Sequence, residues 1–257
     1  TDVEPMKELV NKKVFINGVS ARQGGGLNYL NQLIKKDYLP PNLTVSIIVH
    51  EGSVGKVLTH SGINVIRSSF ASGGLLNRFI WENLYLPFYL YFNNFDYVLL
   101  PAGIRPFLRL GKLRIISVSQ NMLLFDEREL QKLPIISKWK FKLLKILQIY
   151  TFKNSDLVIF ISHFAKNKIE KYTKIVKSIA IHHGVDSCNA KTPVKSPFDF
   201  SYVLYVSHLF DYKGHIEVLE SWAMFKKSDS YRNYKEELKL VFLGDNKTRY
   251  GAKVKQH

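Results

Sequence analysis

Two glycine-containing turns are the segments of this sequence whose residue types best suit phosphate binding. The first is Gly24-Gly25-Gly26, which follows the apolar run Lys13–Asn17 and opens a segment with helical periodicity that includes Asn28. Consecutive glycines let a bound group approach the backbone, and the free N–H groups at a helix start attract anions. The spacing is not GxGxxG, so a dinucleotide fingerprint is absent and an ordinary strand-to-helix turn is the alternative.

The second turn, Ser207–Gly214, leaves an apolar run and ends in Lys213-Gly214 where a helical segment begins. An ammonium group beside the positive end of a helix could neutralise a diphosphate. His208, earlier in the same turn, is charged only part of the time near neutral pH. Because a Lys-Gly pair at a helix start is common, this turn by itself does not establish phosphate binding.

Other polar clusters have structural explanations. Asp126, Glu127 and Glu129 could bind sugar hydroxyls or act as an acid and base, but carboxylates at the start of a helix are also favoured by its dipole. The spacing of three histidines is too irregular for a zinc motif on one helix, which favours structural roles and no metal site; they are His163, His182 and His183.

Short apolar runs rich in Val and Ile alternate with segments long enough for helices. Continuous apolarity without alternation is typical of strands buried on both faces, so the sequence predicts an α/β fold with a doubly wound, mostly parallel sheet. The expected helices include 27–36, 138–152 and 164–172, the last with Ser162 as its N-cap. The expected strands are 13–17, 44–50, 64–67, 96–100, 114–119, 156–161 and 178–182.

The pattern breaks after His183-Gly184-Val185-Asp186 and then restarts. Residues 188–199 are polar and contain Pro193 and Pro197, as in a linker. Strands 202–206 and 238–244 with helix 215–226 between them predict the beginning of a second α/β domain. We therefore divide the chain into a domain 1–187, a linker 188–199 and an incomplete domain 200–257.

Composition favours anionic partners. Lys and Arg outnumber Asp and Glu by 37 to 21, which leaves a formal net charge of +16. The single cysteine, Cys188, excludes an intramolecular disulfide and fits a reducing compartment. Residues Thr1–Pro5 do not resemble a signal peptide and no apolar run is long enough to span a membrane. We expect a cytoplasmic protein.

One helical segment is both basic and apolar. Trp139, Leu143, Ile146 and Tyr150 fall on one stripe of the segment 137–150, with lysines 138, 142 and 145 alongside. Two interpretations remain open. The favoured one packs the stripe on the sheet with the lysines in water, and the other places the helix on an anionic membrane surface at the inner face of the membrane.

The order of the motifs resembles the group 1 glycosyltransferases, retaining enzymes with the GT-B fold of two Rossmann-like domains. The resemblance runs from about residue 13 to 245 and has no single decisive motif. It rests on the glycine-rich turn with its following helix, Trp81-Glu82, Leu86-Pro87, Gln120-Asn121 with Phe125, Val158–Ser162, His183–Asp186, Lys213-Gly214 and Leu240–Asp245.

The resemblance implies transfer of a hexose from a nucleotide diphosphate-sugar to a saccharide or lipid-linked acceptor. It implies retention at the anomeric carbon without a metal or other cofactor, in polysaccharide or lipopolysaccharide assembly. The donor diphosphate would be bound by Lys213, His208 and Gly214. The acceptor loop would be Gly24, Gly25, Gly26 and Asn28, and the catalytic group Gln120, Asn121 and Glu82.

The sequence departs from the family pattern in three places. His208 stands where an arginine is frequent, and Gln120 stands where a histidine is common, which keeps a hydrogen-bonding role but removes proton transfer. The paired glutamates of the donor domain have no counterpart up to His257. We therefore also expect a fragment of a longer enzyme. The alternatives are an inactive glycan- or membrane-binding remnant and, on charge alone, a salt-dependent nucleic-acid binder without sequence specificity.

Overall fold

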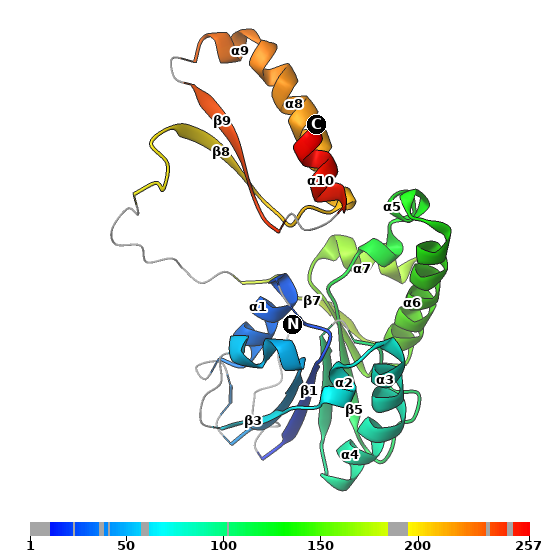
Figure 1. Cartoon of the computed structure of the whole chain (residues 1–257). Helices are drawn as coiled ribbons and strands as arrows, with labels where there is room; N and C mark the ends of the chain where they lie inside the picture. Colours follow the sequence, from blue (N-terminus) through cyan, green and yellow to red (C-terminus); the bar gives the residue numbers. More distant parts are fainter. Residues whose placement is uncertain are drawn as a thin grey trace. The chain divides into compact units, whose positions relative to one another are not determined.

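The chain divides into two compact units, with the division after Gly184 (Figure 1). The structure, a computed structural model, describes residues 11–22, 24–35, 39–40, 42–57, 62–101, 103–184, 195–234, 237–245 and 249–257. Most of the predicted linker 188–199, including Cys188, lies outside these described residues, as do Val185 and Asp186.

Unit 1 contains a seven-stranded sheet in which all neighbouring strands run parallel, in the order β3-β2-β1-β4-β5-β6-β7. The predicted doubly wound α/β fold is confirmed. Strand β1 lies in the middle, with Phe15 opposite Ser46 of β2 and Val98 of β4. The strands are β1 Lys13–Gly18, β2 Thr44–Val49, β3 Ile63–Ile66, β4 Tyr97–Pro101, β5 Arg114–Ser119, β6 Leu157–Phe160 and β7 Ser178–Ala180.

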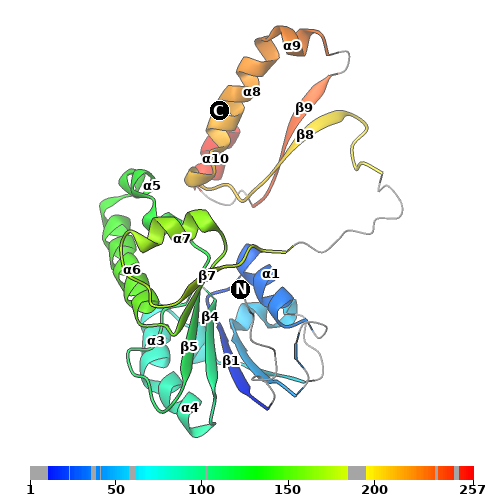
Figure 2. The same ribbon diagram turned by 180° about the vertical axis from the view of Figure 1, so that it is seen from behind.

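Helices cover both faces of this sheet, as its apolar strands require. On one face α1 (Gly24–Leu33) packs against Ile16 and Ile47, and on the other Phe15 and Val98 pack against the helical segment that contains α4 (Leu86–Phe92). Figures 1 and 2 show α1 on the opposite side of the sheet from α3, α4 and α6. The remaining elements of the unit are η3 Glu51–Lys56, α2 Ser69–Ser72, α3 Leu75–Ile80, η4 Trp81–Tyr85, η5 Leu123–Phe125, α5 Glu127–Lys132, α6 Ile135–Lys153 and α7 His163–Glu170.

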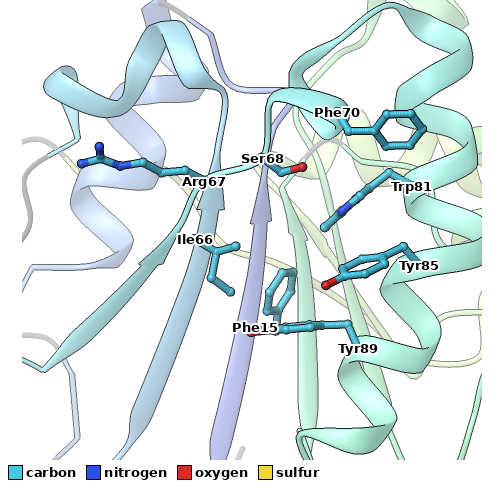
Figure 3. A pocket seen from close by; sticks show the side chains of 8 residues that line it. All are labelled: Phe15, Ile66, Arg67, Ser68, Phe70, Trp81, Tyr85 and Tyr89. Atoms are coloured by element: carbon cyan, nitrogen blue, oxygen red, sulfur yellow. The ribbon is translucent and has the colours of Figure 1, made fainter.

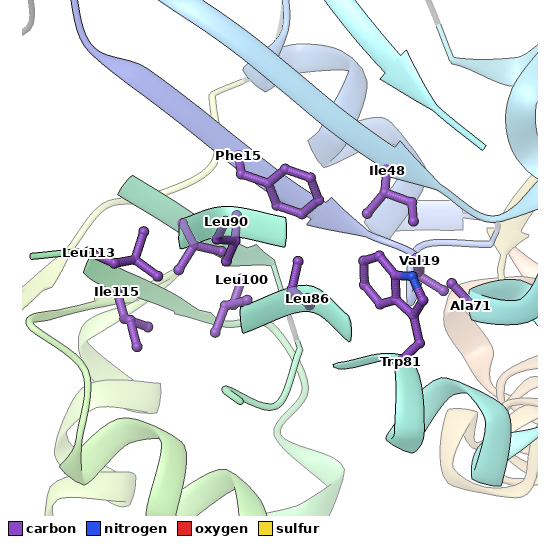
Figure 4. Packing of buried hydrophobic residues seen from close by; sticks show 11 residues of the cluster. Phe15, Val19, Ile48, Ala71, Trp81, Leu86, Leu90, Leu100, Leu113 and Ile115 are labelled. Atoms are coloured by element: carbon purple, nitrogen blue, oxygen red, sulfur yellow. The ribbon is translucent and has the colours of Figure 1, made fainter. Parts of the chain in front are cut away.

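The central core lies between β1, β4 and the helix that follows Trp81 (Figure 4). Phe15 is fully buried there and contacts Tyr89 and Phe95 edge to face, at centroid distances of 5.9 and 5.4 Å. Leu86 and Leu90, one helical turn apart, fill the space beside it. This packing fixes the helix against the strand whose carboxyl end carries the site described below.

Helix α7 begins as predicted. The Ser162 hydroxyl accepts a hydrogen bond from the Ala165 N–H at 3.1 Å, which satisfies one of the free donors of the first turn. Asp126 is likewise the N-cap of α5 and accepts from the N–H groups of Arg128 and Glu129. The structural interpretation of Asp126, Glu127 and Glu129 as helix-start carboxylates is therefore confirmed.

Helix α6 does not pack its predicted stripe on the sheet, so the favoured interpretation of that stripe was wrong. Trp139, Leu143 and Ile146 are exposed, whereas the opposite side of the helix, with Phe152 at its end, packs into the core of β6 and α7. The sequence pattern misled because this helix carries apolar residues on two sides. Where helices are apolar all round, periodicity does not show which side faces the sheet.

Unit 2 has two parallel strands, β8 (Ser201–Val206) and β9 (Leu238–Leu243), joined through α8 (His215–Lys227) and α9 (Asp229–Arg232). The 3-10 turn η6 (Asp211–Lys213) precedes α8, and α10 (Arg249–Gln256) follows β9. The predicted strand, turn, helix and strand are all present. The sequence analysis did not predict α10.

No helix within the described ranges is long and apolar enough to cross a bilayer.

Candidate active site

The carboxyl ends of β1 and β4 mark the point where the winding of the sheet reverses. The chain leaves β1 toward β2 on one side and leaves β4 toward β5 on the other. Ligands of doubly wound folds bind at such a reversal, outside the carboxyl ends of the strands. The loops after the two strands are joined here, since the Ser20 hydroxyl donates to the carbonyl of Pro101 at 3.2 Å.

The predicted glycine turn lies at this edge and is open. Gly24, Gly25 and Gly26 form the first turn of α1, and Asn28 is exposed on its next turn. A methyl group added at Gly25 would meet no described atom within 4 Å. Packing within the described chain therefore does not demand glycine at this position, although it leaves room for a bound group.

Glu82 is buried within unit 1 and is hydrogen-bonded to two neighbouring side chains. Its Oε1 accepts from Asn17 Nδ2 at 3.1 Å and from Arg78 Nε at 2.9 Å, and the residue is only 5% exposed. Asn17 Oδ1 in turn accepts from the Val19 N–H at 3.4 Å. The resemblance implies a catalytic role for Glu82, but its carboxylate is buried. Glu82 instead braces the loop that leads from β1 to the glycine turn.

A π-helical turn, η4, places Glu82 at this position. The Leu86 N–H bonds to the carbonyl of Trp81, five residues back, and Pro87 follows directly. Pro87 has no N–H to offer the carbonyl of Asn83, so the regular α-helical ladder cannot continue through this segment. Insertions of this kind are frequent at functional sites.

Gln120 and Asn121 follow β5 at the same edge of the sheet. Gln120 Nε2 is buried without a hydrogen-bond partner among the described residues. A buried amide without a partner carries a desolvation cost of about 1–3 kcal/mol, which a ligand oxygen would remove. Asn121 is exposed, and its Oδ1 accepts from the Leu123 N–H at 3.0 Å. Asn121 thus shapes the loop and keeps its amide nitrogen available.

Aromatic contacts bring the segment after β7 back toward α1. The rings of Tyr29 and His183 meet edge to face at 5.0 Å, and those of His163 and His182 lie 5.4 Å apart. Burial raises the pKa of the Tyr29 phenol to about 12, so the phenol stays protonated at neutral pH. The His163–His182 and Tyr29–His183 pairs give these histidines a structural role.

In unit 2 the Lys213 side chain is exposed next to the start of α8. Its ammonium lies 5.3 Å from the Tyr212 ring centroid, and no ion pair to it is formed by the described residues. Gly214 has φ 69°, the left-handed region, where it ends η6 and begins α8. Glycine adopts this conformation at low cost, and the chain can therefore place Lys213 beside the start of α8, where the Ile216 N–H donates to the Tyr250 hydroxyl at 3.2 Å.

His208 is held by the loop after β9. The N–H of Asp245 donates to His208 Nδ1 at 3.1 Å. This contact occupies Nδ1, so Nε2 is the ring nitrogen left to interact with a bound group. His208 could thus offer Nε2 to a phosphate oxygen.

An apolar cavity of about 280 Å³ lies elsewhere in unit 1, beside the edge strand β3 (Figure 3). None of the predicted site residues lines it. Of its polar groups, the Ser68 hydroxyl already caps α2. A binding site usually has several convergent polar groups, whereas the lining of this cavity is mainly apolar and aromatic. Its lining residues are Phe15, Ile66, Arg67, Ser68, Phe70, Trp81, Tyr85 and Tyr89.

Four residues that support the edge were not predicted from the sequence: Asn17, Ser20, Tyr29 and Arg78. Asn17 gave a signal, since an amide interrupts the apolar run of the first strand and is nonetheless buried. Arg78 was detectable as the i−4 partner of Glu82 on a helix. Ser20 and Tyr29 gave no comparable signal in the sequence. In the described part of the chain, no group of three His, Cys, Asp or Glu side chains is placed to hold a metal ion.

Comparisons with known proteins find similarity in structure only. No protein-family model and no curated protein match the sequence. Sucrose-phosphate synthase from Thermosynechococcus elongatus superposes with a TM-score of 0.62 at 14% identity, over 95% of this chain and 66% of the other. The apo lipopolysaccharide outer core galactosyltransferase WaaB gives 0.50 at 13%, over 95% and 63%. S. aureus MnaA in its UDP co-structure gives 0.48 at 14%, over 95% and 65%.

These comparisons and the parallel sheets define the class of fold. The chain has the α/β architecture of GT-B type on which glycosyltransferases such as WaaB are built. It spans about two thirds of the length of these proteins.

Proposed function

We propose that this chain belongs to a nucleotide-sugar-dependent glycosyltransferase that transfers a hexose to a saccharide or lipid-linked acceptor, with retention, in surface polysaccharide or lipopolysaccharide assembly. One observation carries the proposal: an open glycine turn and a buried Gln120 amide, which has no hydrogen-bond partner among the described residues, share the carboxyl edge of a GT-B-type sheet. Both offer N–H donors, which suit the oxygen-rich surface of a sugar or phosphate.

In this proposal unit 1 binds the acceptor and unit 2 binds the donor. The acceptor hydroxyl oxygen would form a bond to the anomeric carbon while the bond from that carbon to the diphosphate oxygen breaks. The diphosphate leaves with the electron pair and takes up the hydroxyl proton. Lys213, beside the positive end of α8, would stabilise the charge that develops on the leaving group. The step needs no metal, and Gln120 and Asn121 would orient the acceptor.

The donor role of Lys213 can be tested by calorimetric titration with uridine and guanosine diphosphate-sugars. We expect Lys213→Ala to weaken binding about 10- to 100-fold, because a charge-assisted contact contributes roughly 1.5–3 kcal/mol. Lys227→Ala, at an exposed position on α8, is the matched control and should bind normally. Equal affinity of the Lys213→Ala variant and the unchanged protein would contradict the proposal.

The acceptor role of the glycine turn can be tested without loss of stability. Gly25→Ala places a methyl group in open space within a helix, so we expect the free energy of unfolding to rise by about 0.5–1 kcal/mol. The same methyl group would occupy the room for the acceptor and lower transfer, measured as acceptor-dependent release of nucleoside diphosphate. Because the variant is at least as stable, reduced transfer cannot reflect unfolding. Unchanged transfer would remove Gly25 from the site.

A further inference from the structure

Helix α6 has an apolar surface that nothing in the described part of unit 1 covers. We call this surface the outer stripe. It consists of the adjacent pair Ile135-Ile136, followed at intervals of three or four residues by Trp139, Leu143 and Ile146. All five side chains are more than half exposed, and Ile136 is 87% exposed. Single exposed apolar residues are ordinary, but a continuous stripe on one helix is not.

The outer stripe faces away from the core. Phe141, Leu144, Gln148 and Phe152 form the inner side of α6 and pack with β6 and α7. Because a helix advances about 100° per residue, these positions lie roughly half a turn around from Trp139. The core is therefore complete without the stripe, and the stripe's exposure does not result from a misplaced helix.

Lysines border the stripe on both sides. Lys138 and Lys142 lie on one side and Lys140 on the other, all exposed, and the Lys142 ammonium is 5.3 Å from the centroid of the Trp139 ring. Of the 19 residues of α6, five are lysine and none is acidic. Long aliphatic stems let lysine reach past an apolar surface to anions at its border. Trp139 at the middle suits the boundary between water and hydrocarbon.

The apolar surface continues beyond α6. Tyr150 on the same side contacts Phe107 at a centroid distance of 5.4 Å, and Phe107 contacts Phe79 of α3 at 6.0 Å. Phe107 and Phe79 are both partly exposed. Aromatic side chains thus extend the stripe from one helix to the next on the outer side of the helical layer.

We propose that the outer stripe of α6 is a membrane-surface site that lies in the interface of a bilayer rich in anionic lipids. An apolar face with basic borders and no acidic residue is the pattern of helices that lie in the membrane plane. A protein partner would need acidic residues along two parallel borders, while an anionic lipid surface supplies phosphates on both sides without any such match. This site is independent of the proposed transferase activity.

Vesicle flotation tests the proposal with the full chain and no nucleotide-sugar. We expect binding to vesicles of equal parts phosphatidylcholine and phosphatidylglycerol, weak binding to pure phosphatidylcholine, and a blue shift of Trp139 fluorescence. Trp139→Glu should reduce binding at least tenfold. Met224 lies on α8 and is 74% exposed, so Met224→Glu is the matched control and should leave vesicle binding unchanged. Replacement of Lys138, Lys140 and Lys142 by glutamine should weaken binding about 100-fold, since each lysine contributes about fivefold.

A second set of lysine replacements distinguishes a specific membrane site from a general effect of net charge. Lys227, Lys253 and Lys255, exposed in unit 2, are replaced by glutamine to give the same change in net charge. Equal losses for the two sets would overturn the proposal, as would absence of binding to anionic vesicles. The proposal would also be overturned if the protein sediments as a dimer and Trp139→Glu dissociates that dimer, because a second copy would then cover the stripe.

Discussion

Replacement of Glu82 by alanine is expected to lower the free energy of unfolding of unit 1 by about 4 kcal/mol, as for a broken buried ion pair. The change leaves Arg78 without its carboxylate and removes the acceptor of Asn17, both inside a helix–sheet contact. Urea denaturation followed by circular dichroism measures the loss. The glycine turn should also lose its fixed position, because Asn17 holds the loop that precedes it through Val19.

Two comparison variants make this test specific. Asp229→Ala breaks the pair of Asp229 with Arg232, in which both side chains are highly exposed, and should change stability by less than about 1 kcal/mol. The double variant Arg78→Leu with Glu82→Leu removes both buried charges at once and should recover most of the lost stability. If Glu82→Ala unfolds at the same urea concentration as the unchanged protein, the bracing role of Glu82 is wrong.

Gly244→Ala is expected to destabilise unit 2 by about 3 kcal/mol, the upper range for overpacking, and to abolish donor binding. A methyl group at Gly244 would overlap the carbonyl of Ser207 and come within 2.9 Å of the His208 nitrogen. These are backbone atoms, which cannot rotate out of the way. Calorimetric titration with nucleotide-sugars and thermal unfolding of the same sample measure the two effects.

The expected loss of donor binding should result from displacement of the loop after β8, and not from a change in strand β9. Beyond Gly244 the two loops remain joined, since the Leu209 N–H donates to the carbonyl of Asp245 at 3.0 Å and the Asp245 N–H donates to His208. Leu243→Ala, the neighbouring exposed position, keeps these bonds and should bind donor normally. Normal binding by Gly244→Ala would show that the position of this loop does not matter for the donor.

Most strands and helices could be predicted because their signals are local. Strands buried on both faces need continuous apolar residues, and Ser162 before a helical segment is a cap whatever surrounds it. The segment Leu75–Phe92 was harder, because Pro87 breaks the hydrogen-bond ladder and the chain bridges the break with a π-turn. The spacing of apolar residues is interpreted with the geometry of a regular helix, and it therefore does not reveal a π-helical insertion.

The features of the candidate site likewise divide into those that have a local sequence signal and those that do not. The two glycine turns, Gly24–Gly26 and Lys213-Gly214, were identifiable because each follows an apolar strand and opens a helix. Gln120 and Asn121 were indicated only by the family resemblance. The hydrogen-bonding state of each side chain was not identifiable from the sequence. The acceptor bond at His208 and the unpartnered amide of Gln120 depend on neighbours far away in sequence. Hydrogen-bond partners of this kind are a property of packing.

Apolar continuity and turn chemistry act over a few residues, so parallel α/β units with glycine turns at helix starts follow from the sequence alone. The burial of Glu82 against Arg78 and Asn17, and the outward orientation of the α6 stripe, follow only from packing in three dimensions. A residue's burial depends on which of its faces meets the rest of the chain. For a helix with two apolar sides, packing decides which side is buried.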